Sequence, residues 1–179
     1  MAMLLSDDVV VLRQLVPDDA DDWMAGDDAE EVHWFEFPGP APRRDVERAI
    51  AAWSESQPID GPVRHWAICV QETGGLVGGV ELGDLGDGAV SLAYVVFPTW
   101  RRRGIATRAC RLALAYAGTA MDCRTARIKV PQGQVASIAL ARRLGAAVTG
   151  MEVTAAGTIT IVLRLDLGSA RSRSPRGAR

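Results

Sequence analysis

The sequence predicts a single α+β domain, built on a mixed and mostly antiparallel sheet of about seven strands flanked by about four helices. Strand-like segments follow one another as hairpins in the middle of the chain and then alternate with helical segments, which requires both antiparallel and parallel pairing. The chain has 179 residues, an ordinary size for one domain, and 48% of them are hydrophobic. We therefore expect one core and one domain over residues 1–167.

The first sixty residues predict one strand followed by two helices. Residues 9–16 are mostly apolar and favour a strand. Pro17 and the acids after it then favour a helix start, because proline suits the first turn and carboxylates suit the positive end of the helix dipole. This acidic helical region is predicted over residues 18–33. A second helix is predicted over residues 43–56, where apolar residues recur at helical spacing.

The remaining residues predict six strands and two helices. Glycine-containing turns separate the strands of the hairpins, and a strongly apolar strand ends just before Pro98. Each of the two helices then connects one strand to the next. The predicted strands cover residues 63–71, 76–85, 89–97, 124–130, 146–153 and 158–167, and the predicted helices cover residues 104–116 and 134–144.

The end of the chain has a different composition. Residues 168–179 hold four arginines, three serines and few apolar side chains. We expect a disordered basic tail here, because too little apolar surface is available to offset the entropy of ordering. A role of the tail in RNA binding is the alternative, but we expect a solvated terminus and no nucleic-acid partner.

Composition argues against several other classes of protein. No apolar run is long enough to cross a bilayer, and the N-terminus lacks the features of a secretory signal. The three cysteines and two histidines have no ligand-like spacing, so we expect no metal site. We therefore expect a cytoplasmic protein with no membrane partner, present as a monomer or a homodimer.

Charge is distributed unevenly along the chain. Residues 1–60 hold fifteen acidic and four basic residues, a net charge of −11, whereas residues 61–179 have a net charge of +9. Such a division favours an anionic ligand on the second part and a cationic ligand on the first. The alternative is that the acids of the first part are simply solvated surface residues.

The most informative segment covers residues 90–117, where a buried strand leads through an arginine-rich turn into a helix. Gly104 permits close approach of a ligand to the backbone. The first amides of a helix have no partners within it, and the helix dipole adds positive potential. Together with the arginines before Gly104, these groups predict an anion site suited to a pyrophosphate. An ordinary helix start with small residues for packing is the alternative.

This segment resembles the acetyl-CoA-binding motif of the GNAT superfamily of N-acetyltransferases. The family pattern Arg/Gln-x-x-Gly-x-Gly/Ala reads RRRGIA at residues 101–106, after a strand that ends with YVVFP at residues 94–98. A second family motif is matched by QVAS at residues 134–137 with LGA at residues 144–146. The resemblance covers residues 9–166 and implies the acyl-CoA N-acyltransferase fold. Within the superfamily the chain is most similar to the ribosomal-protein alanine N-acetyltransferase-like branch.

The resemblance implies a role for each residue of these motifs. Backbone groups of Val95, Val96 and Phe97, at a strand bulge, would hold the pantetheine arm, and the Val96 amide would stabilise the developing oxyanion. Gln134 and Ser137 would flank the cofactor near the thioester sulfur. The helix start would hold the pyrophosphate through the residues Arg101, Arg102, Arg103, Gly104, Ile105, Ala106 and Thr107.

The groups that move protons are less clear from the resemblance. Many relatives carry a glutamate base or a tyrosine acid at positions where this chain has Ser91 and Ala141. We therefore take Ser137 as the candidate donor and Glu81 as the first candidate base, although Glu81 is about equally well read as an exposed strand carboxylate. The weaker candidates are Tyr94, His33 and Glu36. Residues Trp34, Phe35 and Glu36, together with Phe37, are placed at the acceptor pocket, with core packing as the alternative for the aromatics.

The sequence thus predicts an N-acetyltransferase that moves an acetyl group from acetyl-CoA to a primary amine by direct attack in a ternary complex. The acceptor is expected to be cationic, either a protein N-terminus or a small amine. The alternative is a non-catalytic acyl-CoA-binding or regulatory domain of the same fold.

Overall fold

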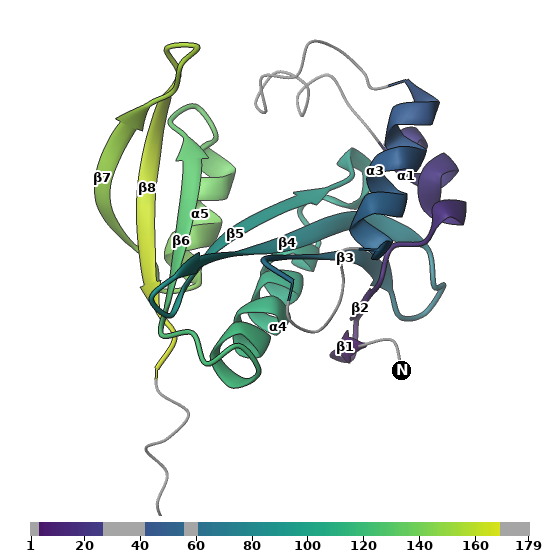
Figure 1. Cartoon of the computed structure of the whole chain (residues 1–179), viewed down its shortest axis with the longest axis horizontal. Helices are drawn as coiled ribbons and strands as arrows, with labels where there is room; N and C mark the ends of the chain where they lie inside the picture. The colour runs from purple at the N-terminus through teal and green to yellow at the C-terminus, as the bar shows by residue number, and fades with distance from the viewer. Residues whose placement is uncertain (1–3, 27–41, 56–60, 169–179) are drawn as a thin grey trace, which may run out of the picture.

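The computed structural model describes residues 4–26, 42–55 and 61–168, which form one eight-stranded sheet with helices on both faces (Figure 1). No helix in these residues is long and apolar enough to cross a membrane. The strands are β1 (Leu5–Ser6), β2 (Val10–Arg13), β3 (Val63–Val70), β4 (Leu76–Gly86), β5 (Ala89–Val96), β6 (Thr125–Pro131), β7 (Ala147–Val153) and β8 (Ile159–Asp166). The helices are α1 (Ala20–Gly26), α3 (Arg43–Glu55), α4 (Ile105–Thr119) and α5 (Val135–Arg143), with 3₁₀ turns at Pro17–Asp19 and Pro98–Trp100.

The sheet confirms the predicted fold class. Its strand order is β1-β2-β3-β4-β5-β6-β8-β7, and every neighbouring pair is antiparallel except β5 and β6. The sheet has one strand more than expected, because β1 pairs with β2 through Leu5 opposite Leu12. A strand of two residues is too short to produce an alternating pattern in the sequence.

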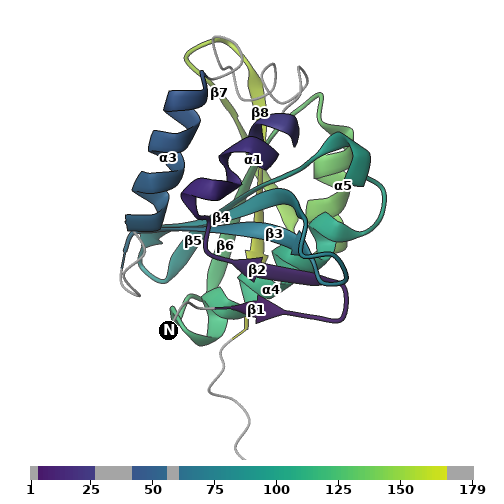
Figure 2. The same cartoon turned by 90° about the vertical axis from the view of Figure 1, so that its right-hand side faces the viewer.

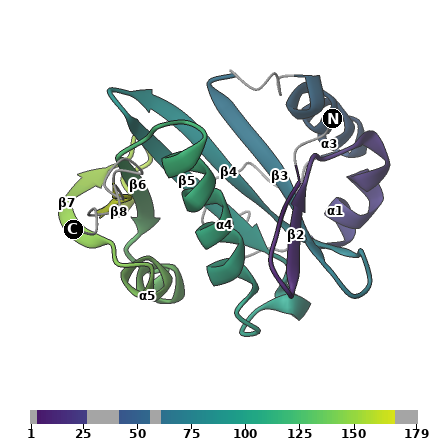
Figure 3. The same cartoon turned by 90° about the horizontal axis from the view of Figure 1, so that it is seen from below.

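The helices divide the core into two layers. Figures 1 and 2 show α1 and α3 over one face of the sheet and α4 against the other, and Figure 3 shows α4 and α5 together on that second face. Strand alternation explains the division, because successive side chains of β3 point to opposite faces. Trp66 is fully buried on the α4 face, where its ring meets Tyr116 edge-on at 5.5 Å. Ala67 is buried on the α1/α3 face with Ile50 and Phe97.

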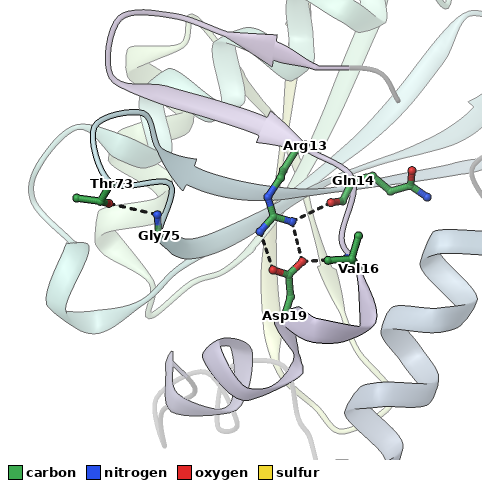
Figure 4. Close-up of polar contacts among 6 residues, drawn as sticks. All are labelled: Arg13, Gln14, Val16, Asp19, Thr73 and Gly75. Atoms are coloured by element: carbon green, nitrogen blue, oxygen red, sulfur yellow. Dashed lines mark hydrogen bonds and ion pairs between the residues drawn. The ribbon is translucent and has the colours of Figure 1, made fainter. Parts of the chain in front are cut away.

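The first predicted strand is shorter in the structure, and the helix predicted after it begins differently. The strand predicted over residues 9–16 ends at Arg13, and the helix predicted over residues 18–33 begins as a 3₁₀ turn before α1. The helix α1 runs to Gly26, and residues 27–33 lie outside the described part of the chain. The strand ends early because Arg13 turns to Asp19, donating hydrogen bonds of 2.7 and 2.6 Å to its carboxylate (Figure 4).

Asp19 fastens the chain between β2 and α1. Its carboxylate is buried and also accepts a hydrogen bond of 2.9 Å from the Val16 amide (Figure 4). The hydrogen bond between Thr73 and Gly75 in the same figure belongs to the turn between β3 and β4. Burial alone would raise the pKa of Asp19, but the hydrogen bonds from Arg13 and Val16 outweigh it and lower the pKa. This carboxylate therefore stabilises the fold in its charged form.

Replacing Asp19 with asparagine is expected to lower the free energy of unfolding at neutral pH by about 2 kcal/mol. The Arg13 guanidinium donates to both carboxylate oxygens of Asp19, and asparagine keeps only one acceptor oxygen and no negative charge. A lowered pKa means that the contribution is complete above the ordinary aspartate pKa and is lost as pH falls through the folded-state pKa. Urea unfolding at pH 7 and at pH 3 measures both effects. The control Asp166→Asn changes a carboxylate that is 81% exposed and should alter stability little. Equal losses in the two variants at pH 7 would contradict this role of Asp19.

The sheet opens between β5 and β6, and this opening positions the site. The two strands are parallel neighbours over only three residue pairs, from Ala89 opposite Thr125 to Ser91 opposite Arg127. Beyond Ser91 they separate, and Figure 1 shows β6, β8 and β7 swinging away from β5. The edge of β5 from Leu92 to Val96 is therefore left facing a gap in the sheet. The division between a domain at residues 1–167 and a tail at residues 168–179 stays a prediction, and residues 169–179 lie outside the described part.

Candidate functional site

The end of β5 presents backbone groups to the opening in the sheet. The Phe97 amide donates a hydrogen bond of 2.9 Å to the Val77 carbonyl on the β4 side. Because backbone groups alternate along a strand, the amide and carbonyl of Val96 point to the opposite side, where β6 has separated. The Arg101 side chain confirms this direction, since its Nε donates a hydrogen bond of 2.9 Å to the Val96 carbonyl. The Val96 amide is thus directed toward the opening, as its predicted role requires.

The predicted bulge at Val95–Phe97 is wrong. Pairing between β4 and β5 continues without a shift from Leu82 opposite Leu92 to Gly78 opposite Val96, and the irregularity of this hairpin lies between Asp84 and Gly86. The close approach of the two strands depends on Gly78, because a Cβ there would lie 2.2 Å from the Val95 carbonyl oxygen. The glycine-rich stretch at residues 74–79 therefore belongs to the β3–β4 hairpin and does not open a helix.

Gly104 begins α4 in a left-handed conformation, with a φ of +78°. A Cβ at this position would meet no atom within 4 Å, so the backbone faces open space. The first hydrogen bond of the helix runs from the Arg108 amide to the Gly104 carbonyl at 3.1 Å. The amides of Ile105, Ala106 and Thr107 precede that bond and are available to an anion. The helix start is therefore open to a ligand, and its role as a pyrophosphate site stays a prediction.

The three arginines before Gly104 are arranged differently from one another. Arg101 is directed back to the Val96 carbonyl, and Arg103 lies over the Trp100 ring with its guanidinium carbon 4.8 Å from the ring centre. Arg102 is exposed and adopts a φ of +65°, which bends the chain sharply before the helix. Two of the three guanidiniums are therefore held close to the end of β5, and all three add positive potential there.

A groove beside the start of α4 adds basic residues that the sequence reasoning missed. It has a volume of about 560 Å³ and is lined by Gly104 and Thr107 together with Arg108, Arg111 and Arg143. Arg108 is held by two carboxylates, Asp7 at 2.9 Å and Asp8 at 2.6 Å. Helical spacing from Gly104 could have identified Arg108 and Arg111, because residues three to four apart share a face. Arg143 comes from α5, which no local pattern places here.

Reversing the charge of Arg111 or Arg143 is expected to weaken CoA binding by roughly tenfold at low salt, because each guanidinium adds positive potential to an anion site. The loss should shrink at high salt, where exposed charges are screened. Titration calorimetry of Arg111→Glu and Arg143→Glu with CoA measures it. The control Arg44→Glu changes an 86% exposed arginine on α3. A loss in the control as large as in the two groove variants would contradict a local role.

Glu81 lies in a cluster on the α1/α3 face of the sheet. It is the direct cross-strand neighbour of His65, and its Oε2 lies 3.2 Å from Nδ1 of the imidazole. The His65 ring stacks on Trp53 of α3, with ring centres 4.5 Å apart. Burial raises the pKa of Glu81, and burial lowers the pKa of His65 to about 4. A carboxylate with a raised pKa is better suited to accept a proton near neutral pH.

Ser137 lies against Tyr94, which the sequence ranked only as a weaker candidate. Ser137 is in the first turn of α5, and its side chain is hydrogen-bonded to the Tyr94 hydroxyl. Burial raises the pKa of Tyr94 to about 12, although the bond to Ser137 acts in the opposite direction. The phenol is therefore protonated across the neutral range and is a proton donor. Ala141, at the position where relatives carry a tyrosine acid, is fully buried.

The candidate residues fall into two groups on opposite faces of the sheet. Tyr94 packs against the core on the α4 face, whereas Glu81 reaches Trp53 through His65 on the α1/α3 face. The strand β5, with its open edge, lies at the boundary of the two groups. Trp34, Phe35 and Glu36, predicted at the acceptor pocket, lie outside the described residues, as does His33. Within the described residues, no three His, Cys, Asp or Glu side chains gather as a metal site would require.

Comparison with known proteins identifies the family of this chain. The sequence model of the acetyltransferase (GNAT) domain matches residues 10–147. No curated protein sequence matches the chain.

Solved structures share the fold over nearly the whole chain. A GNAT-family acetyltransferase from Bacillus anthracis has a TM-score of 0.81 at 12% identity, covering 92% of this chain and 99% of that chain. A putative ribosomal-protein-serine acetyltransferase from Vibrio cholerae has a TM-score of 0.77 at 19% identity, covering 92% and 97%. The microcin C7 self-immunity acetyltransferase MccE, in complex with acetyl-CoA and AMP, has a TM-score of 0.76 at 15% identity, covering 89% and 93%. At these identities the likeness establishes the fold.

Proposed function

The chain belongs to the GNAT acetyltransferase family, and from that premise we propose that it transfers the acetyl group of acetyl-CoA to a cationic primary amine. The observation that carries the proposal is the helix start at Gly104 beside the open edge of β5. A left-handed glycine facing open space, three unpaired first-turn amides and a basic groove together suit the pyrophosphate of CoA. The Val96 amide, directed into the gap between β5 and β6, suits a thioester carbonyl.

The acceptor nitrogen must lose its ammonium proton before it can attack, it loses a second proton as the amide forms, and the departing thiolate gains one proton. The amine nitrogen attacks the thioester carbon, the carbon–sulfur bond breaks, and CoA leaves as a thiolate. Binding both substrates in one site supplies proximity, and the Val96 amide stabilises the oxyanion. We assign the ammonium proton to Glu81, whose raised pKa favours acceptance of a proton. We assign the proton that the thiolate gains to the Tyr94 hydroxyl, with Ser137 as its hydrogen-bonding neighbour, and the second proton of the amine restores the Tyr94 hydroxyl through solvent.

The charge of the acceptor is inferred from the acidic first part of the chain. Residues 1–60 carry a net charge of −11. Ion pairs within and between α1 and α3 neutralise some of it, because Arg43 contacts both Asp21 and Glu47 and Arg48 contacts Asp45. We take this net negative charge, together with Glu81, to favour a cationic amine over a neutral or acidic one. A protein N-terminus and a small polyamine both fit this description.

The experiment that tests the proposal follows release of free thiol from acetyl-CoA with a panel of peptides, polyamines and amino sugars. We expect turnover with cationic amines, at rates that fall as salt rises because the attraction is screened. Turnover that is insensitive to salt would refute the charge argument. CoA binding without turnover on any amine would instead indicate a non-catalytic acyl-CoA-binding domain of the same fold.

A further inference from the structure

We propose that His65 is a positioning residue for the base Glu81: its imidazole donates a hydrogen bond from Nδ1 and holds the carboxylate at the solvent-facing end of a half-buried aromatic cluster. The inference rests on the proposed function, because it assigns a role to the partner of the proposed base. The resemblance to the family assigned no role to His65.

The pairing of the two side chains is fixed by the sheet. His65 on β3 and Glu81 on β4 are direct cross-strand neighbours, and such neighbours have Cβ atoms about 5 Å apart. Nδ1 and Oε2 lie 3.2 Å apart, within reach of a hydrogen bond. The His65 side chain is 13% exposed and that of Glu81 is 38% exposed. The imidazole is therefore the covered partner, and the carboxylate is the one that a substrate amine can reach.

An aromatic stack keeps the imidazole in place. The His65 ring lies nearly parallel to Trp53, at an angle of 22°. Trp53 in turn meets Trp23 of α1 edge-on at 5.8 Å, and Trp23 meets Phe97 at 5.9 Å. Aromatic pairs at these distances are stabilising. The orientation of the imidazole is thus connected through two helices to Phe97, directly after β5, where the thioester is expected.

The protonation state of His65 determines what its contact does to Glu81. Because burial lowers the pKa of His65 to about 4, the ring is neutral at physiological pH. A neutral ring carries one N–H, which must be on Nδ1 if it donates to the carboxylate. Among the described residues, Ala93 lies opposite Glu81 on β5 and the Trp53 ring of α3 stacks on the imidazole.

A second carboxylate of the same chain shows what a charged partner does. Asp19 is held by the Arg13 guanidinium, and its pKa is lowered although the group is buried. Glu81 is held by a neutral imidazole, and its pKa is raised by burial. Both carboxylates are oriented by a donor, but only the pKa of Glu81 is raised. A neutral donor is therefore the arrangement that orients a base without removing its basicity.

Steady-state kinetics over a range of pH tests the inference with three variants. His65→Leu removes the donor, whereas His65→Asn keeps an N–H close to the position of Nδ1. Glu81→Gln removes the base itself. Thermal melting of each variant confirms that it is folded, and CoA binding shows whether the cofactor site is intact.

In His65→Leu we expect kcat to fall about tenfold, because a misplaced catalytic group loses much of its proximity advantage. We expect the rising limb of its pH–rate profile to move to higher pH, because a lost donor destabilises the charged carboxylate and raises the pKa of Glu81 further. His65→Asn should recover most of the rate and the original limb. The KM for acetyl-CoA should be unchanged in both, which separates positioning from general loss of structure.

Each outcome decides between the two proposals. If wild type turns over and His65→Leu keeps the wild-type rate and pH profile, the role of His65 is overturned while the acetyltransferase activity stands. If Glu81→Gln keeps the rising limb, the base is another group and the positioning role is overturned with it. If the wild-type chain acetylates no amine, the proposed function is overturned first.

Discussion

Replacing Gly104 with glutamate is expected to raise the dissociation constant of acetyl-CoA at least about a hundredfold, because like charges brought together at a binding site cost several kcal/mol. The Cβ would point into open space at the start of α4, so the new carboxylate would stand where the pyrophosphate is expected. The φ of +78° adds a second cost, since residues other than glycine are strained there by about 1 kcal/mol. Titration calorimetry and the thermal shift on adding acetyl-CoA measure the loss.

Two further variants separate charge from backbone strain. Gly104→Ala carries the strain without the carboxylate and should retain most of the affinity. Gly157→Glu places a carboxylate on a glycine of the β7–β8 turn that has a φ of +86° and also faces open space. This control should lose stability to a similar extent and bind acetyl-CoA normally. Acetyl-CoA binding by Gly104→Glu with unchanged affinity would refute the pyrophosphate site.

The sequence predicted the parts of the fold that depend on local patterns. The strands of the central hairpins and the helix after Gly104 could be predicted because turn glycines and apolar periodicity lie within a few residues of each other. The first strand was predicted too long because Arg13 ends it through Asp19, six residues away. The strand at Leu5–Ser6 was missed because it is defined by its partner Leu12 and not by its own composition.

In the site, too, the residues of a continuous motif could be predicted, whereas residues brought together by tertiary contacts could not. Gly104 and the arginines before it form a continuous motif, so the sequence could place the candidate anion site at the start of α4. His65 was missed because its role depends on the register of β3 against β4, which places it opposite Glu81. Tyr94 was ranked low because its contact with Ser137 joins a strand to a helix that follows forty residues later in the chain. Pairings of this kind depend on tertiary packing, which no local pattern encodes.

Replacing Tyr94 with phenylalanine is expected to lower kcat by about a hundredfold, since a positioned proton donor commonly contributes a factor of this size or more. The ring and its packing against the core are retained, so only the hydroxyl is lost. Burial raises the pKa of Tyr94 to about 12, and a group with this pKa remains protonated throughout the working range. The wild-type rate should therefore show no decline with pH that is due to Tyr94 below about pH 10.

The chain contains its own control, because Tyr116 is its only other tyrosine. Tyr116 lies on α4, is 7% exposed and packs edge-on against Trp66 of β3. Tyr116→Phe should keep the wild-type kcat, whereas Tyr94→Phe should lose it without a change in the affinity for CoA. Ser137→Ala should have a smaller effect, because it removes the neighbour of the donor and leaves the donor itself. If Tyr94→Phe and Tyr116→Phe have the same kcat as wild type, the thiolate receives its proton from another source, and Ser137 and solvent are the donors that remain at the open strand edge.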